Sequence, residues 1–268
     1  MHTALTIAGS DSGAGAGIQA DLKTFAAFGV YGLSVVTAVT AQNTTRVSTF
    51  LAMPPELVAA QIEAVASDFP VGAVKTGMLG GAAVTEAVAA AIARHGLSPL
   101  VVDPVIVAKS GDTLLPPDAL ASLKACLLPL ARVVTPNRPE AEALAGMAIR
   151  TTGDAREAAR RILDLGPQAV VIKGGHFEGD ELTNLLVEGN TVTAFTSRRI
   201  ASRHTHGTGC TFASAIAARL AEGSSLGEAV GDATEFVRGA VAHGLPLGRG
   251  HGPLDHFWRG VPERAVEP

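Results

Sequence analysis

The residues best suited to chemistry lie together at Gly207, Thr208, Gly209 and Cys210. Two glycines bracket a threonine, and apolar residues after Cys210 recur at the i, i+3, i+4, i+7 spacing of a buried helix face. Because the first N–H groups of a helix lack partners within it and lie at the positive end of its dipole, we expect an anion hole for a phosphate or phosphoryl group. The same position should lower the pKa of the Cys210 thiol, which makes it a candidate base. The alternative is an ordinary glycine turn followed by a small buried cysteine.

Polar side chains also follow three apolar runs that read as buried strands. Asp103 follows one run, Lys173 follows another, and Asn137 and Glu140 come after the third. Carboxylate oxygens are typical Mg²⁺ ligands, so Asp103 and Glu140 are candidates to hold Mg²⁺ directly or through its water shell. Lys173 is a candidate contact for a nucleotide phosphate. Equally, Asn137 suits a helix N-cap, Glu140 a first-turn carboxylate, and Lys173 a solvated lysine at a strand exit.

Gln42 stands in a polar turn after the β-branched run 32–39. A side-chain amide donates and accepts at once, which suits the edge of an aminopyrimidine or a similar heterocycle. Ordinary turn chemistry explains the same residues, and the position alone leaves both interpretations open.

Composition narrows the class of protein. The chain has 268 residues, 47% of them hydrophobic and 17% charged, with a net charge of −4. This is typical of a compact globular protein and disfavours nucleic acid as a partner. No apolar run approaches the ~18 residues of a membrane-spanning helix, so we expect a cytoplasmic protein. The two cysteines, Cys126 and Cys210, are too few for a disulfide framework and lack metal-site spacing.

Strands and helices alternate along the chain. We predict strands over residues 4–8, 32–39, 73–75, 100–103, 132–135 and 169–172, a hairpin over 185–195, and helices over 18–28, 54–68, 82–94, 118–130, 154–165 and 226–242, besides the helix after Cys210. This order indicates an α/β fold of one domain over residues 1–268, with a mostly parallel sheet and helices on both faces. Ligands bind beyond the carboxyl ends of such strands, where all the candidate residues fall.

Two common nucleotide-binding designs are disfavoured. The loop 9–17 resembles a dinucleotide fingerprint, but Ile18 occupies the place of the third glycine and no acidic residue lies between Asp21 and Glu56. The Walker pattern G-x-x-x-x-G-K-[ST] is absent. The set of residues nevertheless suits phosphoryl transfer, which depends mainly on positioning and charge neutralisation.

Taken together, the motifs resemble the bacterial hydroxymethylpyrimidine/phosphomethylpyrimidine kinases. The matching stretches, in the family's order, are residues 8–23, 40–44, 102–105, 108–112, 134–140, 173–176, 205–210 and 250–253. The resemblance implies a ribokinase-like fold. It also implies ATP- and Mg²⁺-dependent phosphorylation of 4-amino-5-hydroxymethyl-2-methylpyrimidine and then of its monophosphate, for thiamine synthesis.

The resemblance further implies roles for single residues. Cys210 would be the catalytic base and Gly207, Thr208 and Gly209 part of the anion hole. Gln42 would read the pyrimidine. Around its ring would stand Gly9, Asp21, Met78, Val105 and His206. Mg²⁺ and the ATP phosphates would be served by Asp103, Asn137, Glu140 and Lys173. The chain departs from the family pattern at Ala14, Thr76, Ile106 and Asn184, and Asn184 is therefore left out of the predicted site.

Two other functions stay open. A pyridoxal kinase would phosphorylate a hydroxymethyl group on a similar ring, although the Gln42 amide favours the aminopyrimidine. A non-catalytic nucleotide-binding module would be expected to lose the base or the glycines, and Gly207, Gly209 and Cys210 are all present. Apolar surface at the sheet edge would suit a homodimer.

Overall fold

A single sheet organises the chain in the computed structural model, which describes residues 1–106, 116–174 and 180–260. Within these ranges nine strands pair in the order β3-β2-β1-β4-β5-β6-β7-β8-β9. Their bounds are β1 Thr3–Ser10, β2 Tyr31–Gln42, β3 Val47–Ala52, β4 Ala73–Thr76, β5 Leu100–Val102, β6 Val133–Val134, β7 Ala169–Ile172, β8 Glu181–Glu188 and β9 Thr191–Arg198.

The middle of the sheet is parallel and its two edges are antiparallel. Strands β2, β1, β4, β5, β6 and β7 pair in parallel. At one edge β3 pairs antiparallel with β2. At the other edge β8 pairs antiparallel with β7, and β9 pairs antiparallel with β8. The carboxyl ends of the parallel strands therefore meet along one edge, as the sequence predicts.

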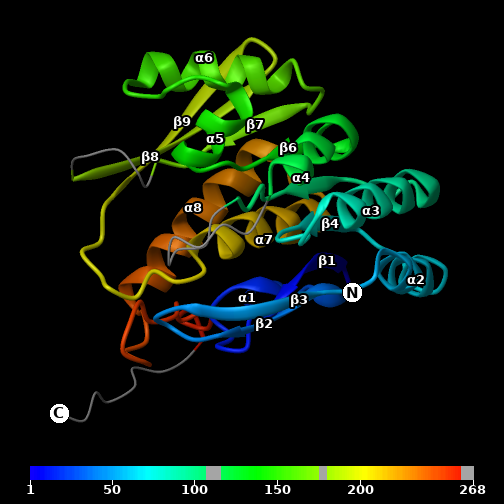
Figure 1. Ribbon diagram of the computed structural model, residues 1–268. Coiled ribbons are helices and arrows are strands. Elements are labelled where there is room, and N and C mark those ends of the chain that lie inside the picture. Colours follow the sequence, from blue (N-terminus) through cyan, green and yellow to red (C-terminus); the bar gives the residue numbers. More distant parts are fainter. Residues whose placement is uncertain (107–115, 175–179, 261–268) are drawn as a thin grey trace.

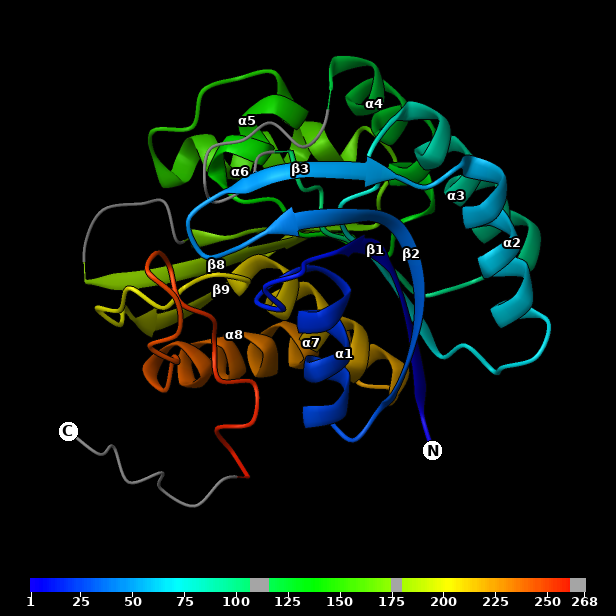
Figure 2. The same cartoon turned by 60° about the horizontal axis from the view of Figure 1, so that its bottom comes forward.

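Helices cover both faces of the sheet (Figures 1 and 2). Their bounds are α1 Gly17–Ala27, α2 Pro55–Ala66, α3 Ala82–His95, α4 Pro117–Ser122, α5 Arg138–Ala145, α6 Thr152–Leu163, α7 Thr208–Ala221 and α8 Leu226–Ala242. Helices α1, α7 and α8 pack on one face around Phe25 and Phe236, and α2 to α6 pack on the other. Alternating side chains of β1 serve both layers, since Leu5 belongs to one core and Ala4 to the other. The predicted α/β layering, a mostly parallel sheet with helices on both faces, is confirmed.

The structure adds strand β3 and helix α5 to the predicted elements and changes the bounds of others. Strand β3 was not predicted; its residues are mostly exposed, so they carry no buried-strand pattern. The predicted helix 118–130 is shorter, because α4 passes into a π-helical turn, Leu123–Leu127, and a 3-10 turn, Leu128–Leu130, that contains Pro129. The predicted hairpin extends to β8 and β9. In the described parts of the chain, no helix is both long and apolar enough to cross a membrane.

Candidate active site

A cavity of about 780 Å³ opens at the carboxyl ends of the parallel strands. It is lined by every residue that the sequence assigns to the site except Asp21. Residues far apart in the chain, such as Gly9, Val105 and His206, thus face one space. The matching stretch 108–112 and the residues Gly175 and His176 lie outside the described residues.

The first turn of α7 forms one wall of this cavity. Gly207 is its N-cap with φ +88°, and a Cβ there would collide with the carbonyl oxygen of Gly15. A Cβ on Gly209 would lie 3.3 Å from Lys173 Nζ. No side chain caps the helix. Thr208 N donates to Thr205 O at 3.4 Å, and the N–H groups of Gly209 and Cys210 remain available to an anion. Packing and the positive φ therefore require glycine at Gly207, whereas a side chain at Gly209 would crowd the Lys173 ammonium.

Cys210 lines the cavity from this turn and is half-buried. Burial raises the pKa of its thiol to about 11, against the lowering effect of the Lys75 ammonium; the Asp21 and Asp103 carboxylates raise it further, and a hydrogen bond with the Gly17 backbone lowers it. The expectation of a lowered pKa is wrong for the free protein. Desolvation and the two nearby carboxylates raise the pKa by more than the helix terminus lowers it. Neither Asp21 nor Asp103 is near Cys210 in the sequence.

Asp21 lies behind the cavity wall, where it holds Lys75. Lys75 Nζ donates to Asp21 Oδ2 at 2.9 Å, and both side chains are fully buried. Thr6 and Ser214 hydroxyls donate to the same carboxylate, each at 2.6 Å. Asp21 has no exposed surface and does not line the cavity, so nothing in the described part of the structure places its carboxylate at a substrate ring, and that contact stays a prediction. Lys75 is the residue of this pair that lines the cavity.

Asp103, Lys173 and Glu140 form a charged cluster in the cavity wall. Lys173 Nζ lies 2.9 Å from Asp103 Oδ1 and 3.8 Å from Glu140 Oε2. Burial raises the pKa of Glu140 to about 7; Lys173 lowers it and Asp103 raises it. The carboxylates thus repel each other across a single lysine. No group of three or more His, Cys, Asp or Glu able to hold a metal occurs within the described ranges.

Asn137 and Glu140 also start α5. The Asn137 side chain accepts from Glu140 N at 3.0 Å, and Glu140 Oε2 accepts from Asn137 N at 2.7 Å. This capping box confirms the structural alternative considered for both residues. Since both also line the cavity, the cap holds their polar groups at its wall.

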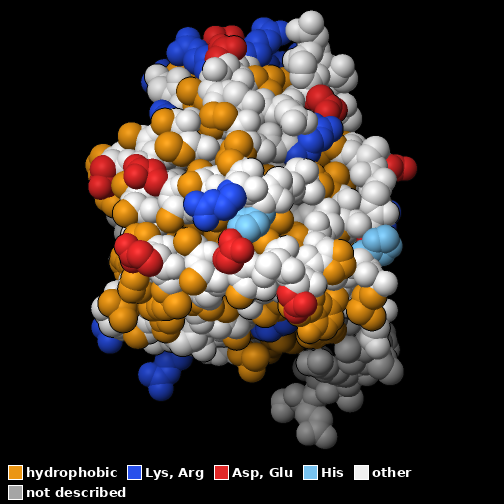
Figure 3. Space-filling view, turned by 90° about the vertical axis from the view of Figure 1, so that its right-hand side faces the viewer, with side chains coloured by type: hydrophobic (Ala, Val, Ile, Leu, Met, Phe, Trp, Pro, Cys, Tyr) orange, Lys and Arg blue, Asp and Glu red, His pale blue; other side chains and the backbone are white. Residues whose placement is uncertain are grey.

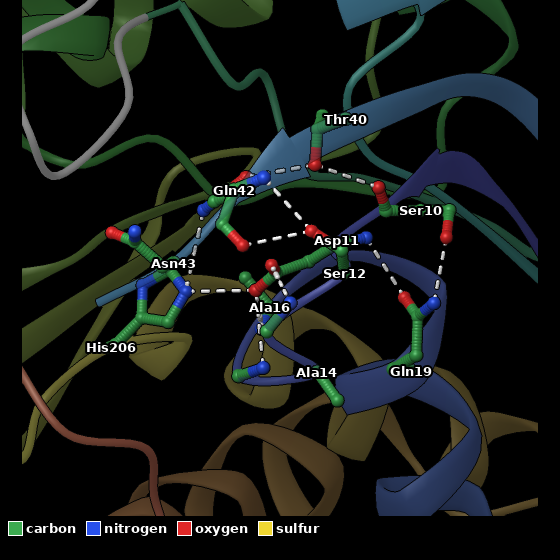
Figure 4. Close-up of polar contacts among 12 residues, drawn as sticks. Ser10, Asp11, Ser12, Ala14, Ala16, Gln19, Thr40, Gln42, Asn43 and His206 are labelled. Carbon is green, nitrogen blue, oxygen red and sulfur yellow. Dashed lines mark hydrogen bonds and ion pairs between the residues drawn. The ribbon is translucent and has the colours of Figure 1, made fainter. Parts of the chain in front are cut away.

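Asp11 is a site residue that the sequence analysis missed. Its carboxylate accepts hydrogen bonds from the N–H groups of Gly13, Gly15 and Ala16, and His206 Nε2 lies 2.9 Å from Oδ2 (Figure 4). Burial would raise the pKa of Asp11, but the hydrogen bonds from His206 and from the Gly13 and Ala16 amides hold it below its usual value. An Asp that precedes several glycines is a signal for such a loop.

Asp11 thereby fixes the pair His206 and Gln42. Gln42 Nε2 lies 3.4 Å from His206 Nε2, and its Oε1 accepts from Thr40 Oγ1 at 3.2 Å (Figure 4). The side chains of Gln42 and His206 come from β2 and from the segment before α7, and both line the cavity. One polar corner is therefore built from three distant parts of the chain.

Asn184 was left out of the predicted site, yet it lines the cavity. It is buried, its Oδ1 accepts from Gly174 N at 3.1 Å, and its amide donates to Thr234 Oγ1 at 3.0 Å. It therefore anchors the residue that follows Lys173. Only the pairing of β7 with β8 reveals this role.

The parallel sheet, the cavity at its carboxyl edge and the uncapped glycine start of α7 beside a lysine and two carboxylates define the class of ribokinase-like phosphotransferases. The sequence model of the family described as phosphomethylpyrimidine kinase matches residues 11–255. The chain belongs to the phosphomethylpyrimidine kinase family.

Relatives and a solved structure agree with this membership. The chain is 52% identical over 261 residues to the hydroxymethylpyrimidine/phosphomethylpyrimidine kinase of Rhizobium meliloti, covering 96% of this chain and 97% of that one. It is 52% identical over 253 residues to the thiamine biosynthesis bifunctional protein ThiED of Geobacter sulfurreducens, covering 94% of this chain but only 52% of that longer protein. The pyridoxal kinase from Staphylococcus aureus in complex with AMP-PCP and pyridoxal superposes with a TM-score of 0.89 at 37% identity, over 97% of this chain and 95% of that one.

Proposed function

We propose that this protein transfers the γ-phosphoryl group of ATP to the hydroxyl of 4-amino-5-hydroxymethyl-2-methylpyrimidine, and then a second phosphoryl group to the monophosphate, for thiamine synthesis. The observation that carries the proposal is the meeting of Cys210, the uncapped start of α7 and Lys173 in one cavity with Gln42. Family membership and the two relatives support it.

In the first transfer, the Cys210 thiolate takes the proton of the substrate hydroxyl while that oxygen attacks the γ-phosphorus. A P–O bond to the substrate forms, the bond to the β-phosphate oxygen breaks, and ADP leaves. A thiol with a raised pKa is a strong base once ionised, at the cost of a small thiolate population. The N–H groups of Gly209 and Cys210 and the Lys173 ammonium stabilise the charge on the transferred group.

The charged cluster suits Mg²⁺. Mg²⁺ in phosphoryl-transfer sites is held by one or two carboxylates together with waters and substrate phosphates. A divalent cation would offset the burial and the repulsion from Asp103 that raise the pKa of Glu140. Asp103 and Glu140 would hold it, directly or through water, and Asn137 and Lys173 would serve the phosphates. Bound there, Mg²⁺ would neutralise phosphate charge during the transfer.

The polar corner around Gln42 supports the assignment of the pyrimidine. The Gln42 amide offers a donor and an acceptor to an aminopyrimidine edge, and His206 is held beside it by Asp11. Met78 and Val105 supply apolar surface in the cavity. Gly9 leaves room for the Met78 side chain, since a Cβ there would lie 3.3 Å from Met78 Sδ.

Pyridoxal is the second candidate substrate, because the Staphylococcus aureus neighbour is a pyridoxal kinase. The test is ADP release measured side by side with hydroxymethylpyrimidine, its monophosphate and pyridoxal. We expect turnover of both pyrimidines, each with a higher kcat/KM than pyridoxal. A higher kcat/KM for pyridoxal would reverse the assignment, and ATP binding without ADP release would favour a non-catalytic module.

We also propose that the protein works in the cytoplasm, where ATP is supplied. We further propose a homodimer formed through the β3 edge of the sheet. Phe50 is 40% exposed and Leu51 70% exposed on this outermost strand. Figure 3 views the molecule from the α2–α3 side and shows hydrophobic side chains gathered in the lower half of that face. Exposed apolar side chains such as Phe50 and Leu51 on an edge strand suit a second copy. Light scattering should give twice the chain mass, and Leu51→Asp should give one chain mass; a monomeric wild type would contradict the dimer.

A further inference from the structure

One short segment near the C-terminal end of the described chain contacts three parts of the candidate site. We call residues 248–256 the brace. Figure 1 shows it in red beside the turn between β2 and β3. It touches the turn after Gln42, the backbone of His206 and the residue after Cys210. None of these contacts involves a group to which the proposed reaction gives a role.

The first contact fixes the turn that carries Gln42. Gly250 N donates to Thr44 Oγ1 at 3.1 Å, and His251 N donates to Thr44 O at 3.1 Å. Gly248, with φ +79°, and Gly250 pack so closely on Thr44 that neither has room for a Cβ. The brace therefore lies directly on the backbone two residues beyond Gln42.

The second contact fixes His206. His206 N donates to Gly252 O at 3.1 Å, and His206 and Pro253 form an isolated parallel bridge. A Cβ on Gly252 would collide with the ring of His204 and with the carbonyl oxygen of Leu245. Backbone pairing thus sets the position from which the His206 ring reaches Asp11 and Gln42.

The third contact reaches the first turn of α7. His256 Nε2 lies 2.9 Å from Thr211 Oγ1, with His256 2% exposed and Thr211 fully buried. Thr211 follows Cys210, and Thr211 N donates to Gly207 O at 2.9 Å. The His256 ring therefore holds the turn that carries both the proposed base and the anion hole.

The brace is itself anchored to the body of the protein. Leu245 N donates to Pro253 O at 2.9 Å, and Asp255 N donates to Ala240 O at 3.2 Å. Leu254 is buried against Ala240 and Val241 of α8. These contacts fix the brace to α8, so it can hold the site residues in place relative to that helix.

We propose that the brace sets the relative positions of Gln42, His206 and Cys210, and that His256 is a positioning residue for phosphoryl transfer through Thr211. The roles of those three residues rest on the proposed function. Because a misplacement of about 1 Å can cost a factor of about 100 in rate, the bond between His256 and Thr211 acts on kcat more than on substrate binding.

The test is a double-mutant cycle with Thr211→Val, His256→Leu and the double variant. We expect each single variant to lower kcat roughly 10- to 100-fold while KM for ATP changes less than about threefold. The double variant should be no worse than the poorer single one, since both remove the same bond. His256→Gln, whose amide nitrogen can replace Nε2, should recover most of kcat.

Thr85→Val is the matched control. Thr85 is buried in the first turn of α3, donates to Gly81 O at 2.9 Å and does not line the cavity. We expect an unchanged kcat for its folded fraction. Losses that multiply in the double variant, or single variants within twofold of wild-type kcat, would overturn the proposal.

Hydrogen exchange separates this proposal from the proposed function. In His256→Leu and in Thr211→Val, amides of residues 205–212 should exchange faster, whereas Thr85→Val should leave them unchanged. This measurement needs no substrate, so it stands even if the wild type releases no ADP from any pyrimidine. Unchanged exchange at residues 205–212 in His256→Leu would overturn the proposed role of the brace, whatever the activity of the variant.

Discussion

Lys75 Nζ lies 2.9 Å from Asp21 Oδ2, and neither side chain has any exposed surface. The pair sits next to Cys210, where the ammonium lowers the pKa of the thiol and the carboxylate raises it. The Asp21 carboxylate oxygens accept hydrogen bonds from Lys75, Thr6 and Ser214. A buried charge pair thus forms part of the electrostatic setting of the proposed base.

Removing one member of this pair should destabilise the fold. Lys75→Met leaves the Asp21 carboxylate buried without its cation, which costs about 3–5 kcal/mol. Unfolding in urea measures the loss. The control is Arg161→Met, whose partner Glu157 lies 3.1 Å away in a pair that is about half exposed, and which should change stability by less than about 1 kcal/mol. Equal losses in the two variants would contradict the burial argument.

Cys210→Ala should separate the two phosphorylations. The first acceptor is an alcohol that must lose a proton, whereas a phosphate monoester is largely ionised at neutral pH because its second pKa is about 6. We expect kcat for the alcohol to fall roughly 10²- to 10⁴-fold and kcat for the monophosphate to fall much less. Single-turnover assays with each substrate measure this. Equal losses would assign Cys210 a role common to both steps, and full activity would make it structural.

The reactivity of the Cys210 thiol should follow its raised pKa. In a Cys126→Ser background, alkylation of the free protein by iodoacetamide should be slow at pH 7 and accelerate about tenfold per pH unit toward the pKa of about 11. Only the thiolate reacts, so the rate reports its population. A plateau reached below pH 8 would show that the helix terminus outweighs burial after all.

His256 should make stability depend on pH. Burial lowers the pKa of this imidazole to about 4, with a smaller contribution from Lys23. The unfolded chain then binds a proton at higher pH than the folded one, so the contribution is complete above about pH 6.5 and is lost as the pH falls to 4. The stability of the wild type relative to His256→Gln should drop by about 3 kcal/mol between pH 7 and pH 4. Parallel stability curves for the two proteins would refute this.

Gln42→Ala should weaken binding of the pyrimidine and spare ATP. Loss of one or two neutral hydrogen bonds corresponds to a rise of KM of about 3- to 30-fold. Gln61→Ala is the control, because Gln61 bonds the Val36 backbone and does not line the cavity. Initial rates with each substrate varied in turn measure the effect. Equal changes in both KM values would count against the reading of the pyrimidine by Gln42.

Sequence alone was sufficient where a feature depends on neighbours in the chain. The alternation of strands and helices predicts the parallel sheet, and parallel pairing places Asp103, Asn137 and Lys173 on one edge. The glycines around Thr208 predict the start of α7 for the same local reason, since Gly207 has a positive φ. In each case backbone geometry and periodicity carry the information.

Tertiary structure decided what depends on distant partners. The sequence predicts Asp21 at the substrate ring; the packing of α1 on β1, together with the pairing of β1 with β4, brings Lys75 to its carboxylate. The Asp before several glycines signals a loop at Asp11 but not its contact with His206, and no sequence pattern indicates the contact between His256 and Thr211. The Cys210 thiol followed the same rule: its position was readable from the sequence, whereas its pKa depends on burial and on charges that only folding brings within reach.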